Sequence, residues 1–396
     1  MLSMKNNFKK IILSFDSLII IKIRRFLSGK FILPNRRFIR KCRINIYCKN
    51  NAHVFFGYHD LIPDHGNLVL VHVVEDGQSK EASVGYIRKD NQNFVEIGKT
   101  KLCNWQAGSR LQWLPKHEQV IVYHDLISDV PHTLFFDTRK KKKIKKVKGN
   151  FYTFSHDGKF GFGFDFKRLA NMHKGYGYEN IVTEDSLGVT KLDVNTDEIS
   201  EIVSLKKLVN ITNSSNARDH YVNVISVSPD NRHIAFLYRF WFEGVQKTKL
   251  MVFDFLGNFV NSFEKSGKIS HFTWRDGRTI LYSYVDSGGS SYELCDVFHP
   301  TKILKKYTVN NFDGHPMFNH RDIDSFVTDT VPDKTGERGL FLVKDEREEE
   351  IYREYNPRMG PLRCDLHPKW SEDGEQIFID SKIGKYREIV TLKADL

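Results

Sequence analysis

Residues 363–381 read Arg363-Cys-Asp-Leu-His-Pro-Lys-Trp-Ser-Glu-Asp-Gly-Glu-Gln-Ile-Phe-Ile-Asp-Ser381. Two short apolar runs flank an Asp-Gly turn, which is the strongest local signal for a β-hairpin. A carboxylate and a histidine, Asp365 and His367, come just before the first run. If the unit recurs along the chain, the hairpin gives the architecture and the polar residues before it indicate a site.

Similar units do recur along the chain. They lie at residues 316–329, 271–284, 224–238, 152–164, 111–123 and 59–71. Most are spaced by roughly 40–50 residues, the period of a four-stranded propeller blade. A second, weaker strand pair follows some units, best seen at 246–260 with a turn at Gly257. The pattern predicts an all-β, seven-bladed β-propeller with four-stranded blades over residues 51–396. A β-sandwich pair is the structural alternative, but regular spacing of one hairpin type favours the propeller.

The positive charge is concentrated in a leader, residues 1–50. This segment holds thirteen Lys/Arg against one acidic residue, Asp16, so its net charge is +12 while the whole chain carries +11. The body is then close to neutral, which argues against a nucleic-acid partner. The apolar run 11–23 is interrupted by charges and too short to span a bilayer comfortably. We expect a basic N-terminal extension, either poorly ordered or packed on the body, with peripheral contact to an anionic membrane face as the alternative.

Two further features bear on location and partners. Five cysteines are scattered, odd in number and without paired metal-type spacing, which indicates a reducing compartment and a cytoplasmic protein. The run 139–148, RKKKKIKKVK, is interpreted as a solvated outer strand whose charge protects an exposed sheet edge.

Three histidines occupy matching positions in the last three units. His271, His315 and His367 each stand three residues before an aromatic residue, Trp or Phe. The first residues of the innermost strands meet around the axis of a propeller, so these side chains are expected to converge. With Asp365 they form a candidate divalent metal site, because neutral imidazole and carboxylate suit Mn, Fe, Zn or Ni. The alternative is that the imidazoles only cap backbone groups.

A second group of polar and aromatic residues comes from the earlier units. Binding of a sugar acid requires arginine side chains, which donate two hydrogen bonds to a carboxylate, and aromatic rings, which pack on the sugar; here they would lie around one mouth of the central channel. The candidates are Tyr58, His59, Trp105, Gln106, Arg168, Tyr176, His220, Tyr238, Arg239 and Arg363.

Several motifs resemble a known family. They are Phe56-Gly-Tyr-His-Asp60, Asn104-Trp-Gln-Ala-Gly-Ser109, Gly175-Tyr-Gly-Tyr178, Asp313-Gly-His-Pro316 and Arg363-Cys-Asp-Leu-His-Pro368. The HP-x-W-S-x-DG unit is similar to TolB-type propellers. The body resembles the seven-bladed propeller of oligogalacturonate lyases and of related proteins from bacterial surface-polysaccharide gene clusters.

The resemblance implies a manganese ion held at the channel mouth by histidines and a glutamine, with a histidine base supported by an arginine. His315 and His367 fall at expected ligand positions. Asp365 stands in place of a ligand histidine, Leu362 or Arg363 near the glutamine position, and Tyr238-Arg239 where the family keeps its base.

The leading hypothesis is β-elimination at a uronate of an acidic oligo- or polysaccharide. The metal, held by His315, His367 and Asp365 with His271, would neutralise the substrate carboxylate. Arg239 or Arg168 would stabilise the enolate, and Tyr238 or His220 would be the general base or acid. Tyr58, His59, Trp105, Gln106, Tyr176 and Arg363 would bind substrate. The alternative is a non-catalytic glycan-binding or scaffold protein, or a glycosyltransferase-associated factor, in surface-polysaccharide biosynthesis.

Overall fold

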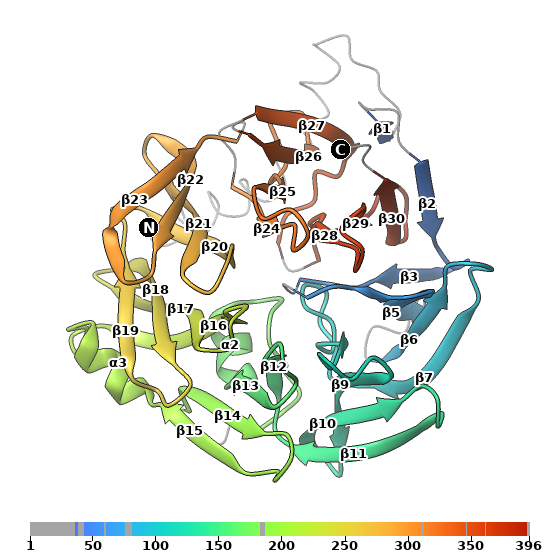
Figure 1. Ribbon diagram of the computed structural model, residues 1–396, viewed down its shortest axis with the longest axis horizontal. Coiled ribbons are helices and arrows are strands. Elements are labelled where there is room, and N and C mark those ends of the chain that lie inside the picture. Colours follow the sequence, from blue (N-terminus) through green and yellow to red (C-terminus); the bar gives the residue numbers. More distant parts are fainter. Residues whose placement is uncertain are drawn as a thin grey trace, which may run out of the picture.

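The computed structural model describes residues 36–38, 43–58, 61–75, 81–182, 187–309, 313–345, 347–360 and 362–393. These residues form seven antiparallel sheets arranged as blades around a central axis (Figure 1). The prediction of an all-β, seven-bladed propeller is confirmed. Most blades have four strands. In blades 1–5 the first strand in chain order lies innermost, whereas in blades 6 and 7 the innermost strands are β24 and β28 and a strand from the leader lies outermost.

The first three blades follow one another along the chain. Blade 1 contains β3 (Ala52–Phe55), β5 (Leu68–Glu75), β6 (Ala82–Arg88) and β7 (Phe94–Thr100), with the short β4 (Asp64–His65) beside β5. Blade 2 contains β8 (Gln112–Trp113), β9 (Val120–Ile127), β10 (Val130–Asp137) and β11 (Lys142–Lys148). Blade 3 contains β12 (Phe151–Phe154), β13 (Phe160–Phe164), β14 (Val189–Asp193) and β15 (Ile199–Val203).

The remaining four blades complete the ring. Blade 4 contains β16 (Arg218–Val227), β17 (His233–Phe242), β18 (Val245–Asp254) and β19 (Phe259–Phe263). Blade 5 contains β20 (Lys268–Trp274), β21 (Thr279–Asp286), β22 (Gly289–Asp296) and β23 (His299–Tyr307). Blade 6 contains β24 (Met317–Phe318), β25 (Ser325–Asp329), β26 (Glu337–Lys344), β27 (Arg347–Tyr355) and β1 (Arg36–Phe38). Blade 7 contains β28 (Lys369–Trp370), β29 (Gln376–Ser381), β30 (Glu388–Lys393) and β2 (Arg43–Tyr47).

A Ser-x-Asp turn forms the inner hairpin in three of the predicted units. In blade 3 the Ser155 hydroxyl donates to Asp157 at 2.6 Å and accepts the backbone N–H of Phe160 at 3.0 Å. The same pair of contacts recurs in blade 4 from Ser228 and in blade 7 from Ser371. The side chain thus satisfies backbone groups that the tight turn leaves unpaired, which explains why this short motif marks the hairpins.

The ring is closed by strands from the basic leader. β2 pairs with β30 as the outermost strand of blade 7, from Arg43 opposite Lys393 to Tyr47 opposite Ile389. β1 adds a fifth strand to blade 6 by pairing with β27. The strands of the propeller therefore begin before residue 51, where the sequence analysis placed the domain boundary. Most of the leader, residues 1–35 and 39–42, lies outside the described residues.

The innermost strand of blade 1 differs from the hairpin expected at residues 59–71. β3 pairs with β5, whereas the segment at Asp64–His65 forms only a two-residue strand on part of the same edge. The other six predicted inner hairpins coincide with inner strand pairs of the structure. The basic run 139–148 contributes β11, the outermost strand of blade 2, as predicted.

Blade 3 contains a helical insertion between its second and third strands. α2 (Phe166–Met172) begins at Asp165, whose side chain accepts the backbone N–H of Arg168. The chain then returns through Gly177, at φ +68°, where an added Cβ would meet the Phe166 carbonyl oxygen at 2.1 Å. Blade 3 is followed by α3 (Leu205–Ile211), which precedes β16. Neither helix, nor any other in the described part of the chain, is long and apolar enough to cross a membrane.

Two fully buried histidines give the fold an expected pH dependence. His72 accepts the Ser109 backbone N–H, and His124 lies 2.8 Å from the Tyr178 hydroxyl and 3.0 Å from the Phe151 carbonyl. Burial, the main cause, lowers the pKa of His72 to about 4 and that of His124 to about 3. The unfolded chain then binds more protons below about pH 6.5, so stability falls as the pH drops toward these folded values, by about 2 kcal/mol for each histidine at pH 5.

The measurement is urea unfolding at pH 7 and pH 5, compared between the parent protein and His124→Gln. The parent should lose about 2 kcal/mol more than the variant between these pH values. The comparison cancels the contributions of other titrating groups. Equal losses in both proteins would contradict a neutral His124 in the folded state.

Candidate metal centre

Three histidines meet where the innermost strands of blades 5–7 begin. His271 lies in β20, and His315 and His367 lie just before β24 and β28. Their ring centroids are 4.0 Å apart for His271–His315 and 4.6 Å apart for His315–His367. The Tyr58 ring, from the end of β3, lies 5.0–5.8 Å from all three. The structure thus brings together the histidines that the repeat register aligned.

His315 presents one unpartnered ring nitrogen. Its Nδ1 lies 2.8 Å from Asp329 Oδ1, and its backbone N–H donates to the same oxygen at 2.7 Å. Its Nε2 is buried and has no hydrogen-bond partner. Because a carboxylate can only accept, Nδ1 carries the proton, and in the neutral imidazole Nε2 keeps a free lone pair.

His367 is held in an unusual backbone conformation. Its φ is +46°, in the left-handed region, and its side chain is 0 % exposed. Neither ring nitrogen has a hydrogen-bond partner; Nε2 lies 3.9 Å from Asp365 Oδ2 and Nδ1 lies 3.5 Å from Asp380 Oδ2. Burial, together with the neighbouring His315, holds the pKa of His367 well below its usual range. The imidazole is therefore neutral at neutral pH, as a metal ligand must be.

Asp365 supplies a carboxylate that stays ionised. Burial alone would raise its pKa, but Arg338 and Arg363 hold that pKa below its usual range. Arg338 Nη1 donates to Oδ1 at 2.7 Å and Arg363 Nε to Oδ2 at 2.6 Å. The two arginines fix the orientation of the carboxylate and leave it further lone pairs.

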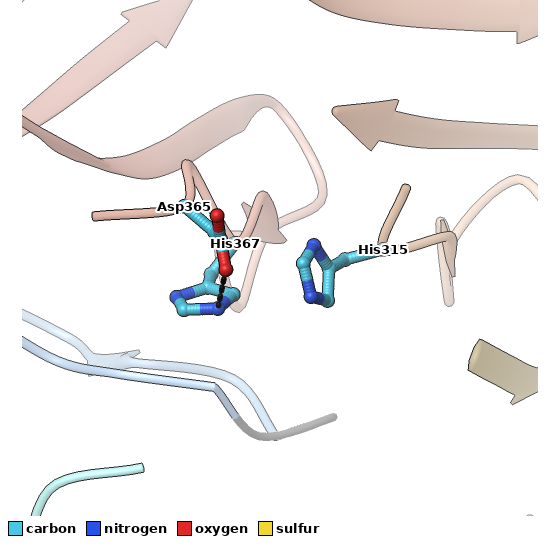
Figure 2. Close-up of side chains that lie close together, drawn as sticks. All are labelled: His315, Asp365 and His367. Atoms are coloured by element: carbon cyan, nitrogen blue, oxygen red, sulfur yellow. Dashed lines mark ion pairs between the residues drawn. The ribbon is translucent and has the colours of Figure 1, made fainter. Parts of the chain in front are cut away.

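His315, Asp365 and His367 (the His/Asp cluster) are all buried, and each offers one ligand atom within 4.8 Å of the other two (Figure 2). Buried nitrogen atoms without partners are costly, and a cation between them would satisfy several at once. Two imidazoles and a carboxylate are a ligand set for a divalent transition metal. The residues present therefore fit a metal ion.

Positive charge lies beside the cluster. Arg239 is 3 % exposed and makes no ion pair in the described part of the chain; its nearest contacts are His173 Nδ1 and the Ser270 carbonyl, both at 3.4 Å. Lys268, whose side chain reaches solvent, has its pKa lowered to about 8 by crowding against protein atoms and by Arg239. A buried guanidinium without a carboxylate partner is costly, so this region favours an anionic ligand.

The predicted substrate-binding residues are distributed around this mouth. Arg363 also donates to the Tyr176 hydroxyl at 2.7 Å, which links blade 7 to the insertion of blade 3. Gln106 is buried and donates to the Arg363 carbonyl at 2.8 Å. Trp105 packs between Phe55 and the Arg387 guanidinium, a contact typical of structural packing. His59 lies outside the described residues.

Three of the predicted catalytic residues form a separate group in blade 4. The Tyr238 hydroxyl lies 2.6 Å from His220 Nδ1, and Arg168 donates to the His220 carbonyl. No hydrogen bond, ion pair or ring contact found in the described residues joins this group to the three histidines. Burial raises the pKa of Tyr238, whose side chain is 0 % exposed, so it is poorly suited to accept a proton. Only Arg239, of the four, lies near one of the three histidines, because it approaches the carbonyl of Ser270, the neighbour of His271.

Sequence reasoning missed the other titratable residues around the histidines. These are His173, Lys268, Asp313, Asp329, Arg338 and Asp380. One signal was available. Asp329 and Asp380 stand at nearly the same distance after His315 and His367, on the second strand of each inner hairpin.

A cavity of about 470 Å³ lies at the opposite end of the axis. Residues from the inner hairpins of all seven blades line it, among them Trp113, Trp274 and Phe318. His156 and His320, which the sequence places on turns, are exposed here. No residue of the His/Asp cluster lines this cavity.

The structure is a seven-bladed propeller with a buried His/Asp group that could hold a metal ion. No protein-family sequence model and no curated protein sequence matches the chain. Its structure is similar to an oligogalacturonate lyase in complex with manganese, with TM-score 0.63 and 12% identity over 92% of this chain and 98% of that one. It is also similar to the oligogalacturonate lyase from Vibrio parahaemolyticus, with TM-score 0.61 and 11% identity over 91% and 97%.

A third similar structure is the tricorn protease, with TM-score 0.54 and 11% identity over 91% of this chain and 35% of that one. At such identities the likeness establishes the fold alone. The sequence-based resemblance to oligogalacturonate lyase-type propellers is confirmed at the level of architecture.

Proposed function

We propose that this protein acts on an acidic oligo- or polysaccharide by metal-assisted β-elimination at a uronate. The observation that carries the proposal is the His/Asp cluster, in which three of the four buried ring nitrogens have no hydrogen-bond partner, together with Arg239, a buried guanidinium without a carboxylate partner close to His271. The first feature suits a divalent cation and the second suits the carboxylate of a sugar acid. Manganese is the metal we propose, since one similar structure is described in complex with it.

His315, His367 and Asp365 would hold the metal. When bound, the ion would neutralise the substrate carboxylate and so make the adjacent C–H bond more acidic. The chain's own residues then have to remove that proton, stabilise the charge that develops on the carboxylate, and protonate the departing sugar oxygen.

His271 is the residue that we propose as the base. Its Nδ1 is buried without a partner, and burial together with the neighbouring His315 holds its pKa well below the usual range. A neutral imidazole next to the cluster can accept the proton on the carbon beside the carboxylate. The electron pair of that C–H bond forms the new double bond as the C–O bond to the leaving sugar breaks, and the imidazolium of His271 then gives its proton to the departing oxygen. This assignment replaces Tyr238 and His220, which lie apart from the cluster.

Arg239 would stabilise the enolate-like charge. Its guanidinium is buried and its contacts to His173 and Ser270 are long, so it can strengthen its bonding to a charge that grows in the transition state. Tyr58, which faces all three histidines, would bound the sugar ring on the axis side.

The test is to incubate the purified protein with oligogalacturonate and other uronate-containing glycans and to record the ultraviolet absorbance of an unsaturated uronate. We expect product with Mn²⁺ and none after chelation. His271→Gln should remove turnover while metal binding is retained, and His320→Gln, at the opposite end of the axis, should leave both unchanged. Failure of every acidic glycan to give product would exclude the lyase proposal.

A non-catalytic glycan-binding protein is the second candidate. One observation favours it: Asp365 already pairs with two arginines, which weakens the charge that it offers a metal. Saturable binding of an acidic glycan, without product and without metal, would support this reading over the first.

We further propose a cytoplasmic location with contact to the anionic membrane face through the leader. Its support is the sequence: the +12 charge of residues 1–50 and the odd, scattered cysteines. Fractionation of cells that express the full chain, with and without its leading 35 residues, tests this. Recovery of both forms in the soluble fraction would contradict the membrane contact.

A further inference from the structure

One carboxylate connects the two histidines of the cluster. Asp329, the last residue of β25, is 1 % exposed. Its Oδ1 accepts from both the backbone N–H and Nδ1 of His315, at 2.7 and 2.8 Å. Its Oδ2 accepts the backbone N–H of His367 at 3.0 Å. A single side chain of blade 6 therefore fixes a ligand of its own blade and a ligand of blade 7.

The next blade repeats part of this arrangement. Asp380, on β29, accepts the backbone N–H groups of Phe56 and Gly57 at 3.0 Å each, and its Oδ2 lies 3.5 Å from His367 Nδ1. Asp380 occupies the second strand of its inner hairpin, as Asp329 does in blade 6. Each histidine of the cluster thus has a carboxylate near Nδ1, and Asp329 makes the shorter contact.

A hydrogen bond from Nδ1–H to a carboxylate fixes the imidazole tautomer and makes the other nitrogen a better donor to a metal. In His315 the nitrogen left over is Nε2, the buried atom without a partner. The bond to His367 has a second effect, since it anchors a non-glycine residue at φ +46°, a conformation that surrounding contacts must maintain.

We propose that Asp329 is the positioning residue of the metal centre: it holds His315 with Nδ1 protonated and Nε2 directed at the ion, and it fixes the backbone of His367 beside it. The inference rests on the metal-binding part of the proposed function and does not depend on the substrate or on catalysis. Asp329 touches neither metal nor substrate and acts only through the two histidines.

The first experiment reads the tautomer in the metal-free parent protein. Long-range ¹H–¹⁵N spectra of ¹⁵N-histidine-labelled protein, with His315 assigned by comparison with His315→Gln, should show Nδ1 protonated and Nε2 bare. A protonated Nε2 on His315 would overturn the inference. Because this result needs no bound ion, it separates failure of the inference from failure of the metal proposal.

The second experiment measures the dissociation constants of Mn²⁺ and Co²⁺ by competition with a chelator. Asp329→Asn should weaken both about 10–100-fold, the usual cost of losing such a partner, and should alter the visible spectrum of bound Co²⁺. Asp329→Glu, which keeps the charge, should recover part of the affinity. The matched control is Asp333→Asn, which removes a hydrogen-bonded carboxylate of the same blade that contacts Thr335 and Arg353.

Unchanged affinity and an unchanged Co²⁺ spectrum in folded Asp329→Asn would overturn the inference. So would an equal loss of affinity in Asp333→Asn, since the effect would then reflect general loosening of blade 6. If Asp329→Asn does not fold, the tautomer of the parent protein and the affinity of Asp329→Glu decide the question.

Discussion

Replacement of His315 by alanine is expected to weaken the binding of Mn²⁺ by more than about 100-fold. Loss of a residue that only orients a ligand already costs about 10–100-fold in metal affinity, and His315 is itself the ligand with the best-defined free nitrogen. The substitution also leaves the Asp329 carboxylate without its imidazole partner. The measurement is metal content of the purified protein together with the dissociation constant from chelator competition.

The matched control is His320→Ala. His320 belongs to the same blade, five positions further along the chain, but it is exposed at the opposite end of the axis, where its Nε2 lies 2.8 Å from the Glu372 carbonyl. Its replacement should leave the metal content unchanged. Full metal occupancy in folded His315→Ala would show that the cluster is not the site.

Replacement of Arg338 by methionine is expected to destabilise the fold by about 3–5 kcal/mol, because the buried Asp365 carboxylate then keeps only Arg363 as an ion-pair partner. Arg338 is 1 % exposed and donates to Asp365 at 2.7 Å and to the carbonyl oxygens of Asn356 and Arg358 at 3.1 Å. Methionine fills a similar volume without any of these donors. The free energy of unfolding in urea, measured in the presence of a chelator, gives the cost.

Arg275→Met provides the comparison. Arg275 forms an ion pair with Asp324 on the surface, with 27% and 66% of the two side chains exposed. Such exposed pairs contribute about 1 kcal/mol or less, so the variant should unfold almost like the parent protein. A cost for Arg338→Met no larger than that for Arg275→Met would contradict a stabilising ion pair between Arg338 and Asp365.

The repeated hairpin could be predicted from the sequence because the residues that form it lie close together in the chain. The Ser-x-Asp turn bonds within six residues, and the tryptophan of the last unit fills the core beside it: Trp370 is 0 % exposed and donates to the Met317 carbonyl of the preceding blade at 3.1 Å. The convergence of His271, His315 and His367 followed from the repeat, since equal positions in successive blades face one axis. Fold and histidine register could therefore be predicted together.

What surrounds the histidines could not be predicted in the same way. Arg338 reaches Asp365 from a different blade, and His173 comes from a helical insertion that no other blade contains in the described part of the chain. Such contacts depend on how neighbouring sheets pack, which no local pattern records. The sequence predicts a catalytic role for Tyr238 from its position at the end of the fourth hairpin and for His220 from its position before that unit. Adjacent residues of a strand point to opposite faces, however: Arg239 approaches the Ser270 carbonyl beside His271, whereas Tyr238 lies in the core.

The strands of the leader could not be predicted for a related reason. No hairpin turn joins β2 to its partner β30, which lies at the other end of the chain. The many basic residues of the segment 36–47 favoured its interpretation as an extension, although Ile46 packs against the core shared by blades 6 and 7. Pairing across such a separation is specified by the partner rather than by the segment itself.

The seam between β2 and β30 makes the order of synthesis matter. β2 ends at Tyr47 and leaves the ribosome first, whereas β30 ends at Lys393. At about 5–20 residues per second the early strand waits roughly 20–70 s for its partner. Six blades can assemble during that interval, but the circle stays open. A premature stop codon shortly before β30 would therefore affect more than one strand. It would also deprive β2 of its partner and leave both β2 and β29 with an unpaired edge.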